Sequence, residues 1–359
     1  MNINQSVETL IENCNSALDD GNCMQANSFL QQAYPLLLKI PRSHILWVYY
    51  YVNQAGVFNN MGRFSESFNC CQNAEKIIPF RDNEYLKAKV EGCKATAYFN
   101  TADYPNAIDS VTKSIKLYMK AHNTEGASHE LITLGNILLR TGKWNQAIKN
   151  YSEALYLSKL KKDKRLEAKA LMRLGFVFRG HRFLYLAIDH YREAERIFKE
   201  LNFNHGLVTA LYERANTYLS LKMTEETLSL IEQIKTLTTQ DPAMRSFLYN
   251  LRYCLHNQNK EFAEAMDCAK FLLEFFKKAH DKKGEADSLE KIASVYYNLS
   301  DMEQSKEYGE QALKIAEEIG DKLLEPGCKE LLKDVDLIIK NNIDLDEIRK
   351  HEDNDNQRN

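Results

Sequence analysis

The chain has 359 residues with a formal net charge of −3 at pH 7, and only 14 glycines and 6 prolines are spread along it. A nearly neutral total charge excludes global attraction to nucleic acid or anionic lipid as the basis of function. The scarcity of helix breakers excludes a string of domains on Gly/Ser/Pro-rich linkers and favours a long helical chain. No apolar run approaches the roughly 18 residues of a membrane-spanning helix, and the N-terminus lacks the apolar core of a signal peptide, so we expect a cytoplasmic protein.

A small residue recurs about every forty residues on an apolar helical stripe. The series is Cys14, Ala55, Ala95, Gly135, Gly175, Ala215, Tyr253 and Ala293. Small residues recur again twelve and nineteen positions after each of these anchors, so that 20 of the 24 positions hold Gly, Ala, Ser or Cys. Small residues at fixed points on two successive helices let the backbones approach closely, so each unit is predicted to be a helical hairpin.

Turn residues fit the same hairpins. Gly62 and Gly142 stand seven residues after their anchors, where the chain turns between two helices, and Pro105 suits the first turn of a second helix. A lone hairpin cannot bury its apolar face, so the units must stack on one another. The sequence predicts an all-α solenoid of about eight hairpins over residues 5–319.

The pattern changes towards the C-terminus. Asp241-Pro242 and the threonines around it predict a bend at 236–245. Residues 321–341 have amphipathic spacing and predict a helix that caps the last hairpin. The polar end, residues 344–359, is predicted to be disordered.

The segment LGNILLRTGKWNQAIKNYSEAL, residues 134–155, resembles the tetratricopeptide repeat, with its L-G pair, spaced alanines and aromatic residue. Its period of about forty, rather than about 34, resembles the repeats of kinesin light chains, of LGN-type adaptors and of bacterial peptide-sensing regulators of the Rap and PlcR type. The resemblance implies a right-handed superhelix whose first helices line a concave groove. It also implies binding of proteins or peptides rather than catalysis.

Helix geometry gives candidate residues for that groove. If Leu131, Leu134 and Leu138 pack inward, a rotation of about 100° per residue places four positions of each first helix on the opposite side. Over the eight predicted units these are 32 positions, and seven of them hold asparagine. Asparagine is enriched there, since it makes up only 30 of the 359 residues of the whole chain. An asparagine side-chain amide both donates and accepts hydrogen bonds, so a row of asparagines can pair with the backbone of an extended peptide. This row resembles the asparagines that peptide-binding members of the family use. The alternative is an asparagine-rich chain whose solvated faces carry this residue by drift.

Charge is distributed unevenly. Residues 140–182 hold twelve Lys/Arg against three Asp/Glu, and residues 281–359 hold twelve against twenty-one. Cations on the groove line would hold a carboxylate of the ligand. The basic stretch 159–165 is instead predicted to form a loop between repeats, and there the alternative is that its positive charges serve only solubility. The predicted peptide-binding residues are Asn53, Asn60, Asn100, His129, Asn136, Arg140, Lys169, Arg173, Phe176 and Asn216.

No nucleotide-binding, hydrolase or metal-ligand motif occurs, so no catalytic residue, cofactor or metal site is predicted, and the chain is not expected to be an enzyme. The first hypothesis is a regulator or adaptor that holds a partner peptide, with an acidic group or a C-terminal carboxylate, in its groove. The second is a structural scaffold that forms a homo-oligomer or docks in a larger complex through its opposed charges. Binding of RNA or DNA through the basic middle ranks third, because few aromatic residues are interleaved with the cations there.

Overall fold

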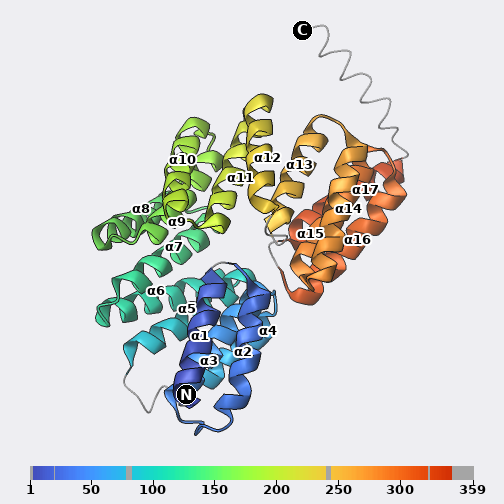
Figure 1. Cartoon of the computed structure of the whole chain (residues 1–359). Helices are drawn as coiled ribbons and strands as arrows, with labels where there is room; N and C mark the ends of the chain where they lie inside the picture. Colours follow the sequence, from blue (N-terminus) through green and yellow to red (C-terminus); the bar gives the residue numbers. More distant parts are fainter. Residues whose placement is uncertain (1–2, 20, 78–82, 240–243, 322–323, 342–359) are drawn as a thin grey trace. The chain divides into compact units, whose positions relative to one another are not determined.

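The computed structural model of the chain describes residues 3–19, 21–77, 83–239, 244–321 and 324–341. These residues form helices joined by short turns, without a β-strand (Figure 1). The helices are α1 (Ile3–Asp19), α2 (Cys23–Leu37), α3 (Ile45–Asn60), α4 (Phe64–Glu75), α5 (Glu84–Asn100), α6 (Tyr104–Lys120), α7 (Thr124–Arg140), α8 (Trp144–Lys161), α9 (Lys164–Gly180), α10 (Leu184–Glu200), α11 (Asn204–Ser220), α12 (Thr224–Thr238), α13 (Arg245–Gln258), α14 (Phe262–Lys278), α15 (Lys282–Asn298), α16 (Met302–Ile319) and α17 (Glu325–Asn341).

The chain divides into two compact units, residues 1–247 and 248–359. In the first unit, α1 to α12 pair in chain order as six helical hairpins, and each hairpin packs beside the one before it. In the second unit, α14 packs on the part of α13 that belongs to it, α15 pairs with α16, and α17 follows. The predicted all-α fold of stacked helical hairpins is confirmed within each unit, and a C-terminal helix follows the last hairpin of the second unit.

The spacing of small and aromatic residues has a direct structural reason. The fully buried ring of Tyr151 on α8 lies across Gly135 of α7, where a Cβ atom would be 2.7 Å from Cδ1 of the ring. In the next hairpin, the buried ring of Tyr191 lies across Gly175, and a Cβ there would be 2.7 Å from Cε1. Each glycine therefore leaves the space that the tyrosine of the second helix fills.

Tight turns join the helices. Gly62 and Gly142 have φ of +75°, the left-handed conformation that glycine adopts without steric cost. At the same place in the following hairpin, Arg182 has φ of 66°. The next helix is often capped by a side chain, as at α9, where Oδ1 of Asp163 accepts a hydrogen bond of 2.9 Å from the backbone N–H of Leu166.

The C-terminal helix α17 covers the last hairpin of the second unit. Its Cys328 is fully buried in one cluster with Leu289 of α15 and Ala312 of α16. The predicted disordered tail, 344–359, lies outside the described residues, and so do residues 240–243 of the predicted bend at 236–245. In the part of the chain that the structure describes, no helix has the length and apolar character to cross a bilayer.

Candidate peptide-binding site

The ten predicted binding residues differ in how far solvent reaches them. The exposed ones are Asn60, His129, Arg140, Arg173 and Phe176. The half-buried ones are Asn100, Asn136, Lys169 and Asn216. Asn53 is only 4% exposed, so its amide is enclosed between helices and is not a surface group. The predicted row of asparagines is therefore interrupted at Asn53, whereas Asn60 at the end of the same helix is exposed.

Side chains from five successive helices lie around Arg173 of α9. Burial raises the pKa of Tyr151, Tyr191 and Glu213, and in each case the nearby positive charge of Arg173 opposes that rise. These groups belong to three different hairpins. We call the following set the Arg173 cluster: Asn136, Tyr151, Arg173, Arg179, Tyr191 and Glu213.

Most polar groups of the Arg173 cluster have partners within it. The Tyr151 hydroxyl donates a hydrogen bond of 2.8 Å to Oδ1 of Asn136, which leaves the Asn136 amide group as a donor. Nη2 of Arg179 donates to Oε2 of Glu213 at 2.9 Å, and these two side chains form an ion pair. Arg173 is exposed and has no ion-pair partner within 4.0 Å among the described residues. On its exposed side the cluster offers the Arg173 cation and the Asn136 amide donor to a ligand, while the buried Tyr191 hydroxyl and Arg179 Nε have no hydrogen-bond partner among the described residues.

The sequence pattern did not reveal the whole of this cluster. The spacing of Tyr151 and Tyr191 assigns both to packing, and it carries no sign that Tyr151 also fixes the Asn136 amide. Arg179 and Glu213 are 34 residues apart, so their ion pair depends on how neighbouring hairpins stack. Periodicity along one helix contains no information on that contact.

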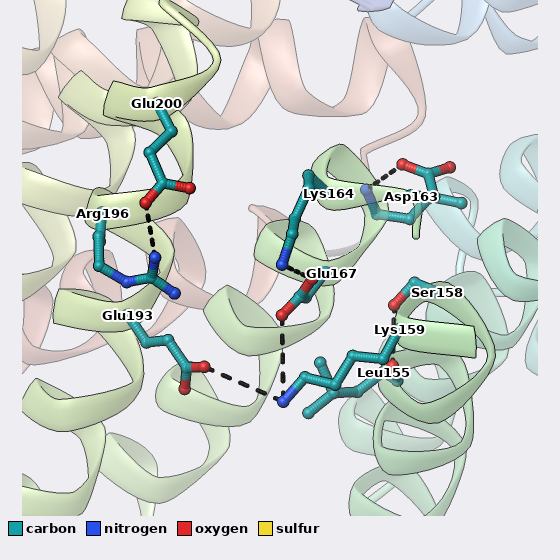
Figure 2. Close-up of polar contacts among 10 residues, drawn as sticks. Leu155, Ser158, Lys159, Asp163, Lys164, Glu167, Glu193, Arg196 and Glu200 are labelled. Atoms are coloured by element: carbon teal, nitrogen blue, oxygen red, sulfur yellow. Dashed lines mark hydrogen bonds and ion pairs between the residues drawn. The ribbon is translucent and has the colours of Figure 1, made fainter. Parts of the chain in front are cut away.

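Part of the predicted basic stretch is used in structural ion pairs. Nζ of Lys164 lies 2.8 Å from Oε2 of Glu167, and Nζ of Lys159 lies 4.0 Å from Oε1 of the same carboxylate. Figure 2 shows Lys159 between Glu167 and Glu193, and its Nζ is 3.9 Å from Oε1 of Glu193. Glu167 is only 3% exposed, so these lysines neutralise a buried carboxylate. Lys159 and Lys164 are therefore less available to a polyanion than the count of cations in this stretch suggests.

A second buried carboxyl group lies on the same first helix as Asn136. Glu130 of α7 is 7% exposed, and its Oε2 has no hydrogen-bond partner among the described residues. Gly92 of α5 makes room for it, because a Cβ at that position would be 3.0 Å from the carboxyl carbon. Burial raises the pKa of Glu130 to about 8, and Nδ1 of His129 is 3.9 Å from Oε1.

Two cavities of the first unit lie away from the predicted binding residues. A cavity of about 680 Å³ is lined by Glu75, Lys87, Val90, Glu91, Lys113, Lys116 and Leu117. It shares no residue with the Arg173 cluster, so a peptide at that cluster would lie on an open face. In the described ranges, no group of three or more His, Cys, Asp or Glu side chains is arranged to hold a metal ion.

Comparison with known proteins agrees with the hairpin repeat. Residues 286–319 match the family model described as tetratricopeptide repeat. Among curated proteins, no sequence matches this chain.

Several solved structures have a similar fold. A Rap protein in complex with Competence and Sporulation Factor aligns with a TM-score of 0.62 and 13% identity, over 88% of this chain and 98% of that one. The apo form of the quorum sensor NprR from B. thuringiensis gives a TM-score of 0.59 and 17% identity, over 86% and 87%. The Rap conjugation gene regulator of plasmid pLS20, in complex with the Phr* peptide, gives 0.57 and 16%, over 87% and 95%.

These low identities establish similarity of fold and nothing finer. The repeat matched in α15 and α16 is built like the hairpins before it, with small residues Ala293, Ser305 and Ala312 all fully buried. The described residues form stacked helical hairpins, and one of these hairpins, residues 286–319, matches the tetratricopeptide repeat.

Proposed function

We propose that this protein is a regulator or adaptor that binds an extended segment of a partner protein on the first-helix face of its hairpins. The observation that carries the proposal is Arg173, an exposed cation that lies beside two partnered pairs, Tyr151 with Asn136 and Arg179 with Glu213. A guanidinium held in this way suits a carboxylate, which it can bind through two parallel hydrogen bonds. The bound segment therefore carries an acidic side chain or its own C-terminal carboxylate at this point.

Neighbouring side chains supply the rest of the contact. The Asn136 amide group, whose oxygen is held by Tyr151, donates to a backbone carbonyl of the segment. Arg140, at the end of the same helix, is a second exposed cation, and the half-exposed ring of Phe176 offers an apolar surface. Two proteins of similar fold support the proposal, because they were solved with Competence and Sporulation Factor and with the Phr* peptide.

The proposal includes five further residues on the first helices, whose contacts with the segment stay predictions: Asn60, Asn100, His129, Lys169 and Asn216. A chain of nearest-neighbour hairpins changes its pitch through small rotations that add up, so a ligand that spans several hairpins would select one pitch. This coupling is how binding would be passed to a second partner. The scaffold and nucleic-acid hypotheses also stay predictions.

The double variant Asn136→Ala/Arg173→Glu tests the proposal. Because it removes one hydrogen bond and reverses the charge that meets the carboxylate, partner recovery from extracts of the native host should fall by at least about a hundredfold. Recovery is measured by quantitative mass spectrometry, and circular dichroism should show unchanged helicity.

The matched control is Lys149→Glu, the same charge reversal at an exposed position on α8. It should leave recovery unchanged, because it lies on the second helix of the hairpin. Equal recovery with the double variant and the control would show that the first-helix face is not the binding surface.

A further inference from the structure

Two consecutive hairpins expose aromatic side chains at the turns between their helices. Trp144 begins α8 and is 42% exposed, Phe183 precedes α10 and is 60% exposed, and Tyr185 is 70% exposed. The Trp144 ring stacks parallel to the ring of His181, which follows α9, with an angle of 3° between the planes. We call the following set the aromatic edge: Lys143, Trp144, His181, Arg182, Phe183 and Tyr185.

Phe183 occupies a position that three of the other hairpins, at Asn22, Asp103 and Asp301, use for capping. At the same place, Asp103 accepts a hydrogen bond from the backbone N–H of Asn106 in α6, and Asp301 accepts one from Gln304 in α16. Phe183 gives no side-chain cap to α10. Since an N-cap stabilises a helix by about 1 kcal/mol, α10 begins without this stabilisation, as do α4, α8, α12 and α14.

Two cations flank the aromatic rings. Lys143 and Arg182 are exposed, and the sequence has no Asp or Glu in residues 140–152 or in residues 168–188. Exposed apolar rings beside unneutralised cations complement a segment that carries an apolar anchor next to carboxylates. Two cations suit one or two carboxylates better than the roughly 6–10 phosphate contacts of a nucleic-acid interface.

We propose that the aromatic edge is a second docking surface, separate from the Arg173 cluster, for an acidic protein segment with an aromatic or aliphatic side chain. The apolar side chain of the segment packs on Phe183 and Tyr185, and its carboxylates pair with Lys143 and Arg182. The stack on His181 holds the Trp144 ring in place before binding, which lowers the entropic cost of association.

The variant Phe183→Asp tests this surface without harming the fold, because it restores the aspartate cap found at Asp103 and Asp301. A displayed random peptide library is selected on the intact chain. The enriched peptides should have net negative charge and an aromatic or aliphatic residue, and Phe183→Asp should weaken their binding by at least about tenfold. The exposed aromatic Tyr156 of α8 gives the matched control, Tyr156→Asp, which should bind as the natural chain does.

Intrinsic fluorescence locates the bound peptide. The chain has two tryptophans, of which Trp47 is fully buried, so Trp144 is the one that iodide reaches. Bound peptide should protect Trp144 from iodide quenching, and Arg173→Glu should not alter that protection if the two surfaces are independent.

Three results would overturn the proposal: no enrichment on the intact chain over Phe183→Asp, enriched peptides without net negative charge, or undiminished binding to Phe183→Asp. Vesicles of phosphatidylglycerol and a single-stranded oligonucleotide are tested in parallel. A Phe183-dependent interaction with either of these, in the absence of peptide binding, would assign the edge to a membrane or a nucleic acid and would equally reject the acidic segment.

Discussion

Replacing Gly135 with leucine should lower the free energy of unfolding by about 3 kcal/mol, as measured by urea denaturation followed by circular dichroism. The new side chain would enter the space of the Tyr151 ring, which is fully buried and also held by its hydrogen bond to Asn136. The ring cannot move into solvent without opening the contact between α7 and α8. Overpacking, rather than a change in helix propensity, is the cause, because leucine is itself a better helix former than glycine.

Gly180→Leu is the matched control, since Gly180 ends α9 and a Cβ there would meet no atom within 4 Å. It should change stability by less than about 1 kcal/mol. The double variant Gly135→Leu/Tyr151→Ala should be more stable than the sum of the two single losses predicts, because the added leucine occupies the space of the missing ring. Strictly additive losses, or a harmless Gly135→Leu, would show that the glycine and the tyrosine are not packed on each other.

Replacing Glu130 with glutamine should remove a large part of the pH dependence of stability. Burial raises the pKa of Glu130 in the folded chain from an ordinary value near 4.5 to about 8. Between these values the folded chain retains a proton that the unfolded chain has released, so stability falls as pH rises through this window. The total loss is about 5 kcal/mol once the pH is well above the folded pKa.

Glutamine has nearly the same shape and does not ionise. Between pH 5 and pH 9, the natural chain should therefore lose about 3–4 kcal/mol relative to Glu130→Gln. Glu125→Gln, which changes an exposed carboxyl on the same helix, should keep the slope of the natural chain. If the free energy of unfolding changed with pH in the same way for the natural chain and for Glu130→Gln, this carboxyl would ionise as readily in the folded chain as in the unfolded one.

The pattern of small residues was sufficient to predict the fold. Gly135 and Gly175 mark close contacts between consecutive helices, and those contacts are local in sequence, so periodicity records them. The same holds for Gly142, because the turn position that it occupies has a left-handed backbone, which glycine adopts without steric cost.

The candidate site was less predictable, because it depends on contacts between hairpins. A rotation of about 100° per residue gives the direction of a side chain from its own helix, but it does not say how far the adjoining helix covers that side chain. Asn53 and Arg173 hold equivalent positions two residues before their anchors, yet Asn53 is buried and Arg173 is exposed. The carboxyl of Glu130 is likewise accommodated by Gly92 on a different hairpin, 38 residues earlier in the chain.

Photo-crosslinking from Phe176 tests most directly whether a partner segment lies against the Arg173 cluster, as we propose. Phe176 is 39% exposed and lies beside Arg179, whose guanidinium carbon is 5.2 Å from the ring centroid. With benzoylphenylalanine at position 176, irradiation in extracts of the native host should yield a covalent adduct that Arg173→Glu abolishes, and the same group at Tyr156 should yield none. Adducts from position 156 but not from 176, with the partner still co-purifying, would contradict the account.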